Sequence, residues 1–311
     1  MSARLLVSLL AGDQEFQRLQ ADDARTAAAR SGLTVDIVFA ESSAILQIQQ
    51  LYKAIHRPAE ERPRAIIVET VVGEGLERVA RAATQAGIGW VLINRRVSYL
   101  EDLRRRHPEL PISSVGTDQV EIGRIQARQF RALVPSGEAL VLYLQGPPDT
   151  SVARERLQGA QEGLSGSGIQ LRVLDGDWTE LGGGKAVESW LRLRTSEGVR
   201  PDLVGSQNDA MAVGARRVLQ RAGARPELAR LRFTGCDGLV DGGQRLVGTG
   251  ELAATVITPS NTGPAVDLVA RALRSKSSPP AEMVLPPISY PPLDVLLLRQ
   301  AGRGPTPRAE V

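Results

Sequence analysis

The chain has 311 residues, which is too long for one ordinary hydrophobic core and favours two domains. A hydrophobic content of 42% and a charged content of 23% are typical of a soluble globular protein. No apolar run approaches the roughly 18 residues of a membrane span. The lack of such a run argues against membrane insertion. The net charge is only +3, and arginines are scattered among acidic residues, which argues against direct nucleic-acid binding. The single cysteine, Cys236, excludes an internal disulfide.

Strand-like apolar runs alternate with amphipathic segments of helical length along the chain. In chain order, the predicted strands are Leu5–Leu10, Thr34–Ala40, Ala65–Glu69, Gly89–Ile93, Ser113–Val115, Ala139–Gln145, Leu171–Leu174, Leu203–Ser206, Leu231–Cys236 and Ala253–Val256. The predicted helices are Phe16–Ser31, Ala44–Ile55, Gly75–Ala86, Gln119–Leu133, Val152–Leu164, Gly184–Arg194, Ala210–Ala222 and Gly263–Arg274. This alternation predicts parallel sheets with helices on both faces.

One parallel sheet of about ten strands would be unusually wide, so we expect an α/β fold with two doubly wound parallel-sheet lobes joined by a multi-strand hinge. The chain is expected to cross between the lobes near Val115 to Asp118, near Thr255 to Pro259, and in the proline-rich stretch Pro279 to Pro292. The expected limits are 1–117 plus 258–285 for the N-terminal lobe, 118–257 plus 286–300 for the C-terminal lobe, and 301–311 for a flexible tail.

Residues Arg96 to Pro111 do not fit the alternation. This segment contains three consecutive arginines followed by His107 and Pro108. We interpret it as a surface helix or loop inserted before the strand at Ser113, with its charges in solvent.

Polar side chains follow three of the predicted strands. They belong to the runs Asn94-Arg95, Gln207-Asn208-Asp209 and Cys236-Asp237-Gly238. In an open α/β sheet, ligands bind at the carboxyl ends of the strands, so these runs predict a protein that holds a small polar molecule. Two structural alternatives stay open, because Asn208 could cap the helix behind it and Asp237 could be a turn residue.

No motif specifies a reaction. The run Gly182-Gly183-Gly184-Lys185 lacks the earlier glycine of a phosphate-binding loop and has Ala186 where a Ser or Thr is required, so we interpret it as a loop and helix start. No G-x-G-x-x-G follows the first strand. Neither histidine, His56 or His107, has a neighbouring metal-ligand pattern. We therefore expect no enzymatic activity, no cofactor and no metal.

Several motifs occur in a characteristic order between residues 4 and 298. They are Phe16 at the first helix, Asn94-Arg95, Gly116-Thr117-Asp118 before Gly123, the run from Ser151 to Arg156 before Gly159, the run from Gln207 to Ala212, the run from Thr234 to Gly238, and the run from Leu252 to Val256. In this order, the chain resembles the type I periplasmic sugar-binding proteins of the ribose- and galactose-binding kind. Their fold is shared by the effector domains of LacI-like repressors.

The resemblance implies a ligand site made of amide, arginine, acidic and aromatic side chains. The implied residues are Gln14, Phe16, Asn94, Arg95, Arg154, Trp178, Asn208, Asp237 and Thr258. In the family, aromatic rings cover the apolar faces of a sugar, and arginines donate forked hydrogen bonds to its oxygens. As alternatives, Phe16 could be a core residue and Arg154 could pair with a neighbouring helix acid.

One departure from the family changes the expected ligand. Asn94 stands where many relatives have an acidic residue, so the accepted hydroxyl pattern is expected to differ. A modified sugar, a polyol, an inositol-like compound or another polar metabolite stays open.

The resemblance implies a solute-binding protein that closes around a sugar or sugar-like ligand and delivers it to an ABC-type transporter through a membrane permease. The family resides in the periplasm or cell envelope. Residues Met1 to Leu10 do not form an export signal, so a cytoplasmic ligand-sensing module with a sensor partner is the alternative. A repressor is disfavoured, since only Met1 to Arg4 precede the first strand. An enzyme on a similar fold is the least favoured alternative.

Overall fold

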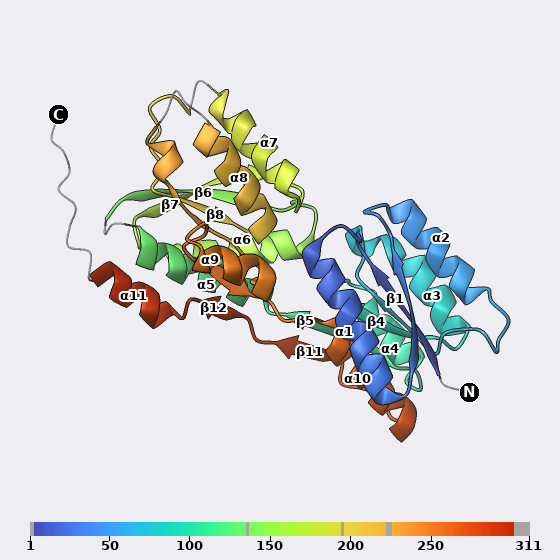
Figure 1. Cartoon of the computed structure of the whole chain (residues 1–311). Coiled ribbons are helices and arrows are strands. Elements are labelled where there is room, and N and C mark those ends of the chain that lie inside the picture. The colour runs from blue at the N-terminus through green and yellow to red at the C-terminus, as the bar shows by residue number, and fades with distance from the viewer. Residues whose placement is uncertain (1–2, 135–136, 194–195, 222–225, 302–311) are drawn as a thin grey trace. The chain divides into compact units, whose positions relative to one another are not determined.

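The computed structural model describes residues 3–134, 137–193, 196–221 and 226–301, shown in Figure 1. The chain divides into two compact units. The N-terminal unit comprises Met1–Thr117, Asp149–Ser151 and Pro259–Pro286, and the C-terminal unit comprises Asp118–Pro148, Val152–Thr258 and Pro287–Val311. Unlike the expected limits, this division puts Thr258 in the C-terminal unit, and Pro286 and residues 149–151 in the N-terminal unit. Most of the expected tail lies outside the described residues.

The N-terminal unit is built on a parallel sheet with the strand order β11-β5-β4-β3-β1-β2. The strands are β1 (Arg4–Leu9), β2 (Thr34–Phe39), β3 (Ala65–Val68), β4 (Gly89–Ile93), β5 (Ile112–Thr117) and β11 (Glu282–Leu285). The helices are α1 (Glu15–Ser31), α2 (Ala44–Ile55), α3 (Glu77–Gln85), α4 (Leu100–Arg106) and α10 (Thr262–Ser275), with a 3-10 turn η1 (Gly73–Leu76).

Successive side chains of these strands point to opposite faces of the sheet, and both faces are buried under helices. Leu6 and Ile66 pack on the face covered by α2, α3 and α4, whereas Leu5 and Ile67 pack on the face covered by α1 and α10. Successive residues of a strand point to opposite faces, so a strand buried on both sides is apolar throughout. This explains why β3 and β4 appear in the sequence as unbroken apolar runs.

The C-terminal unit has a smaller parallel sheet with the strand order β7-β6-β8-β9, and a separate antiparallel pair of β10 with β12. The strands are β6 (Ala139–Gln145), β7 (Ile169–Asp175), β8 (Leu203–Ser206), β9 (Arg232–Thr234), β10 (Thr255–Ile257) and β12 (Ile288–Tyr290). The helices are α5 (Gln119–Leu133), α6 (Ser151–Leu164), α7 (Glu180–Leu191), α8 (Asp209–Arg221), α9 (Arg245–Gly248) and α11 (Leu293–Ala301), with the short helical turns η3 (Leu228–Arg230) and η4 (Val240–Gln244).

Helix α7 begins earlier than predicted. Gly182 and Gly183 lie within α7, whereas we expected them in a loop and the helix to start at Gly184. The Thr179 hydroxyl caps the helix by accepting a hydrogen bond from the Gly182 N–H at 2.9 Å. Gly183 packs directly on the backbone of Met211 in α8, where a side chain would overlap it. The glycine run therefore serves helix packing.

The arginine-rich segment forms α4 and is only partly a solvated face. Tyr99, Leu100 and Leu103 are buried in the core under α2 and α3. On the outside, Asp102 accepts hydrogen bonds from three arginines: Arg81 at 2.9 Å, Arg105 at 2.6 Å and Arg106 at 2.8 Å. Hydrogen bonds from Arg106 first, then from Arg81, hold the pKa of the Asp102 carboxyl well below its usual range.

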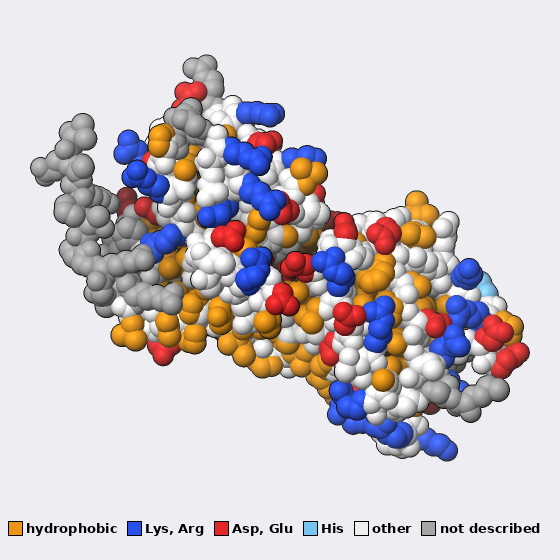
Figure 2. Space-filling view, viewed as in Figure 1, with side chains coloured by type: hydrophobic (Ala, Val, Ile, Leu, Met, Phe, Trp, Pro, Cys, Tyr) orange, Lys and Arg blue, Asp and Glu red, His pale blue; other side chains and the backbone are white. Residues whose placement is uncertain are grey.

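The proline-rich stretch contains regular elements that the sequence did not predict. Strand β11 adds to the edge of β5 in the N-terminal unit, and β12 pairs with β10 in the C-terminal unit. On the face shown in Figure 2, positive and negative side chains are intermixed over most of the surface. Within the described residues, no helix combines the length and hydropathy needed to cross a membrane.

Candidate functional site

Two of the predicted ligand residues lie at the start of α1, after the loop that follows β1. Gln14 is the N-cap residue of α1, and its side chain is half-buried and does not cap the helix. Phe16 lies in the first turn of α1 and is half-buried. Within the described residues, its ring belongs to neither hydrophobic core of the N-terminal unit. Phe16 thus lies outside these two cores, and its ligand role stays a prediction.

Asn94 and Arg95 follow the end of β4 and are held by one acidic residue, Glu69. The Asn94 amide nitrogen donates to Glu69 Oε1 at 2.8 Å, and Arg95 Nε lies 3.9 Å from the same oxygen. Asn94 has a left-handed backbone with φ of 56°, and its N–H donates to the Val115 carbonyl at 3.0 Å. Both predicted residues are thus fixed at the carboxyl end of the sheet.

Glu69 was not predicted as a site residue. It follows β3 and is only 1% exposed. Its Oε2 accepts from the Gln17 amide at 2.9 Å, and its carbonyl accepts from the Gln47 amide at 2.7 Å. The sequence carried a usable signal here, because a carboxylate that ends a fully apolar strand must find buried partners.

In the C-terminal unit, α6 carries two arginines with different roles. Arg154 is exposed, with Nη1 3.4 Å from the Pro148 carbonyl oxygen. Arg156 is buried, donates to Gln119 Oε1 at 2.8 Å and also donates to the Gln207 carbonyl. The sequence motif contains both, and only the exposed Arg154 was predicted to meet a ligand.

Trp178 follows β7 in a left-handed backbone conformation with φ of 71°. Its ring packs on Gly146, where any side chain would overlap the indole, and lies 5.7 Å from the Arg156 guanidinium. The latter distance is that of a cation–π contact. Trp178 is half-buried, so packing fixes the ring and leaves part of its surface in solvent.

Asn208 does the capping that the structural alternative predicted. Its Oδ1 accepts from the Met211 N–H at 2.9 Å at the start of α8. Its amide nitrogen donates to the Trp178 carbonyl at 2.8 Å. An asparagine amide has two N–H donors, so the second donor leaves a ligand contact chemically possible.

Asn208 both caps α8 and donates to the Trp178 carbonyl, and these two contacts lead to a stability prediction. We expect Asn208→Ala to lower the free energy of unfolding by about 1–2 kcal/mol without any ligand, because the α8 cap and the Trp178 tie are both lost. Urea or thermal denaturation followed by circular dichroism measures this loss. Asn208→Asp keeps a capping oxygen and should lose less. Equal stability of the alanine variant and the parent protein would contradict the capping role.

Asp237 and Thr258 are joined through their backbones. Asp237 is half-buried with φ of 106°, and its carbonyl accepts from the Thr258 N–H at 3.0 Å. The Thr258 hydroxyl is buried 3.4 Å from the Cys236 sulfur. Burial raises the pKa of the Cys236 thiol to about 11, so this thiol stays neutral. Thr258 thus directs its hydroxyl at the interior, whereas Asp237 has a strained backbone, is half-buried and forms a parallel β-bridge with Ile257.

The structure joins the predicted residues into small groups within each unit. Asn94 and Arg95 meet at Glu69, and Trp178 is tied to Asn208. These groups offer directional hydrogen bonds and partly exposed rings. No group of three or more His, Cys, Asp or Glu among the described residues could hold a metal ion.

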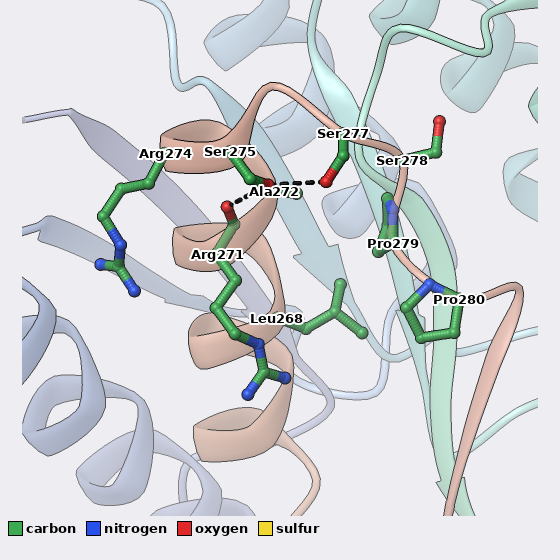
Figure 3. A pocket seen from close by; sticks show the side chains of 9 residues that line it. All are labelled: Leu268, Arg271, Ala272, Arg274, Ser275, Ser277, Ser278, Pro279 and Pro280. Carbon is green, nitrogen blue, oxygen red and sulfur yellow. Dashed lines mark hydrogen bonds between the residues drawn. The ribbon is translucent and has the colours of Figure 1, made fainter.

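A separate depression of about 560 Å³ lies at the C-terminal end of α10. Figure 3 shows its lining from the last turns of α10 and the segment Ser277–Pro280. None of the nine predicted residues lines it. Hydrogen bonds of Ser275 to the Arg271 carbonyl and to Ser277 tie this helix end together. The depression is distinct from the strand ends that carry the predicted groups.

A family model described as a periplasmic binding protein domain matches residues 5–276. The galactofuranose-binding protein of Escherichia coli (strain K12) is 25% identical over 275 residues, which cover 88% of this chain and 82% of that protein. The ribose import binding protein of the same organism is 29% identical over 195 residues, which cover 62% of this chain and 59% of that protein.

Solved structures show the same fold. The crystal structure of a galactofuranose-binding protein superimposes with a TM-score of 0.80 at 22% identity, over 97% of this chain and 100% of that chain. A Caulobacter myo-inositol-binding protein gives a TM-score of 0.78 at 20% identity, over 96% and 97% of the two chains. The predicted α/β fold with parallel sheets in two lobes is therefore confirmed.

Proposed function

Because the chain belongs to the periplasmic binding protein domain family, we propose that it binds a small polar ligand, a sugar or sugar-like molecule, and delivers it to an ABC-type transporter. The observation that carries this proposal is the family match over residues 5–276, which includes all nine predicted ligand residues. The galactofuranose- and ribose-binding relatives support a carbohydrate as the ligand class.

The chemistry of the predicted groups fits such a ligand. A sugar presents hydroxyl groups around its rim and C–H groups on its faces. Arginine, asparagine and aspartate side chains make directional bonds to hydroxyls, and charged partners make these bonds about twice as strong. The half-buried rings of Phe16 and Trp178 cover apolar faces at a low entropic cost. We propose that the predicted residues other than Thr258, whose hydroxyl is buried beside Cys236, contact the ligand.

A thermal-shift and calorimetric screen of furanoses, pyranoses, polyols and inositols tests the proposal. A ligand at one hundred times its Kd should stabilise the native protein by about 2.7 kcal/mol and raise Tm. Trp90 and Trp190 are buried and Trp178 is partly exposed, so binding should change the Trp178 fluorescence. Trp178→Phe should abolish that signal. If no compound of these classes shifted Tm or produced heat, the carbohydrate proposal would be wrong.

We propose a membrane permease as the protein partner, and the periplasm or cell envelope as the location. Relatives named as import binding proteins support this assignment. Co-purification with the permease in the presence of the ligand tests it. Capture of a sensor protein in place of a permease would favour the ligand-sensing alternative. Turnover of a bound compound would indicate an enzyme.

A further inference from the structure

The N-terminal unit places a buried carboxylate directly behind two predicted ligand residues. We propose that Glu69 is a specificity-determining positioning residue. Its charge balances Arg95 and its oxygens orient Asn94, so the site prefers neutral, hydroxyl-rich ligands over anionic analogues. This inference rests on the proposed function and names the charge class of its ligand.

Because Glu69 is buried, its charge acts strongly on neighbouring groups. The side chain is 1% exposed and follows β3, a strand buried on both faces. Water does not screen a charge at such a position, so its field acts strongly on close neighbours. Arg95 is also buried, with Nε 3.9 Å from Glu69 Oε1. The two opposite charges therefore compensate each other inside the unit.

Hydrogen bonds fix where the carboxylate points. Gln17 of α1 donates to Oε2 at 2.9 Å, and Asn94 donates to Oε1 at 2.8 Å. Gln17 is itself held, because its own oxygen accepts from the Leu10 N–H at 3.1 Å. The carboxylate thus joins three elements, α1, β3 and the loop after β4. It sets the orientation of the Asn94 amide, since the amide nitrogen must face Glu69.

Two charged residues that are close in sequence to Arg95 and Glu69 have exposed partners. Arg96 pairs with Glu282 at 3.5 Å, and Glu74 accepts hydrogen bonds from Ser98 at 2.9 and 3.2 Å. These side chains are exposed, with solvent to screen them. In this inference, Glu69 is a buried anion that opposes a ligand carboxylate near Arg95. Repulsion of this kind is a common source of discrimination between similar ligands.

Glu69→Gln keeps the shape of the side chain and removes its charge. Calorimetric Kd values would be measured for one matched pair, D-galactose with D-galacturonate, alongside any neutral hit of the wider screen and the acid that keeps its ring. In the parent protein, the neutral member should bind at least tenfold more tightly. In Glu69→Gln, this ratio should fall at least tenfold, because the buried negative charge beside Arg95 that repels the acid is removed.

Two further variants complete the experiment, one as a control and one as an independent test. Glu60→Gln makes the same change on an exposed carboxylate of the same unit and should leave the ratio unchanged. Arg95→Gln leaves Glu69 as the local charge and should increase discrimination against the acid. This second variant tests the inference even if Glu69→Gln does not fold.

The outcomes separate this inference from the proposed function. Equal weakening of both ligands in Glu69→Gln, with an unchanged ratio, would make Glu69 a merely structural residue and overturn the inference. An unchanged ratio in Arg95→Gln would overturn it as well. If the parent protein bound no neutral compound at all, the proposed function would fail, and this inference with it.

Discussion

Gly214→Ala should destabilise the C-terminal unit by about 3 kcal/mol, at the upper end of the usual cost of overpacking. Gly214 lies in α8 at the point where the backbone of α7 comes into contact with the backbone of α8. A methyl group at this position would overlap the carbonyl oxygen of Glu180, and it would lie 2.8 Å from the Glu180 carbonyl carbon and 3.0 Å from the Gly184 nitrogen. These atoms are backbone, so the clash is relieved only by moving the helices apart.

Helix propensity alone predicts the opposite sign. Alanine is favoured over glycine inside a helix by about 1 kcal/mol. Gly248→Ala provides the matched control, because Gly248 is also helical, lies in the same unit and has no atom within 4 Å of an added methyl group. This control should be neutral or slightly stabilising.

Differential scanning calorimetry of the two variants measures the contrast. The transition that contains the C-terminal unit should move to a lower temperature in Gly214→Ala and should not fall in Gly248→Ala. Equal stability of both variants would show that α7 and α8 do not pack through glycine as described.

The sequence predicted most of the fold because buried parallel strands leave an unmistakable pattern. Strand β4 is an unbroken apolar run between amphipathic segments, and the predicted limits of β4 and β8 match the structure residue for residue. Gly182 and Gly183 were wrongly assigned to the loop before α7, and helix propensity does disfavour glycine. The helix forms anyway, since only glycine lets α7 approach α8 so closely. Tertiary packing decided the outcome.

The candidate site was only partly predictable for a related reason. Residues such as Asp237 stand out because polar groups follow an apolar strand, and the structure keeps them at those strand ends. Glu69 has the same position after β3 but was counted as the last residue of the strand. The partners that explain it, Gln17 and Asn94, come from other elements. Contacts of this kind are not visible in the sequence.

Asp237→Gly should weaken ligand binding at least tenfold while changing the free energy of unfolding by no more than about 1 kcal/mol. The φ of Asp237 is 106°, a conformation that glycine adopts freely and that other residues enter at a cost of about 1–3 kcal/mol. Its backbone is held independently of the side chain, by hydrogen bonds to Val256 and from Thr258 of 3.0 Å each. Glycine therefore relieves strain in the native state and removes the carboxylate proposed to accept hydrogen bonds from the ligand.

Most binding-site substitutions lower ligand affinity and stability together, so the two losses cannot be told apart. In Asp237→Gly, the affinity should fall while the free energy of unfolding rises slightly. Lys276→Gly is the matched control, because Lys276 ends α10 with a left-handed φ of 50° and is exposed outside the proposed site. It should raise stability slightly and leave affinity unchanged. Arg154→Ala, on the exposed face of α6, should also lose at least tenfold in affinity. Unchanged calorimetric Kd values in both Asp237→Gly and Arg154→Ala would place the ligand elsewhere, since charge-assisted bonds to a desolvated ligand cannot be removed without such a loss.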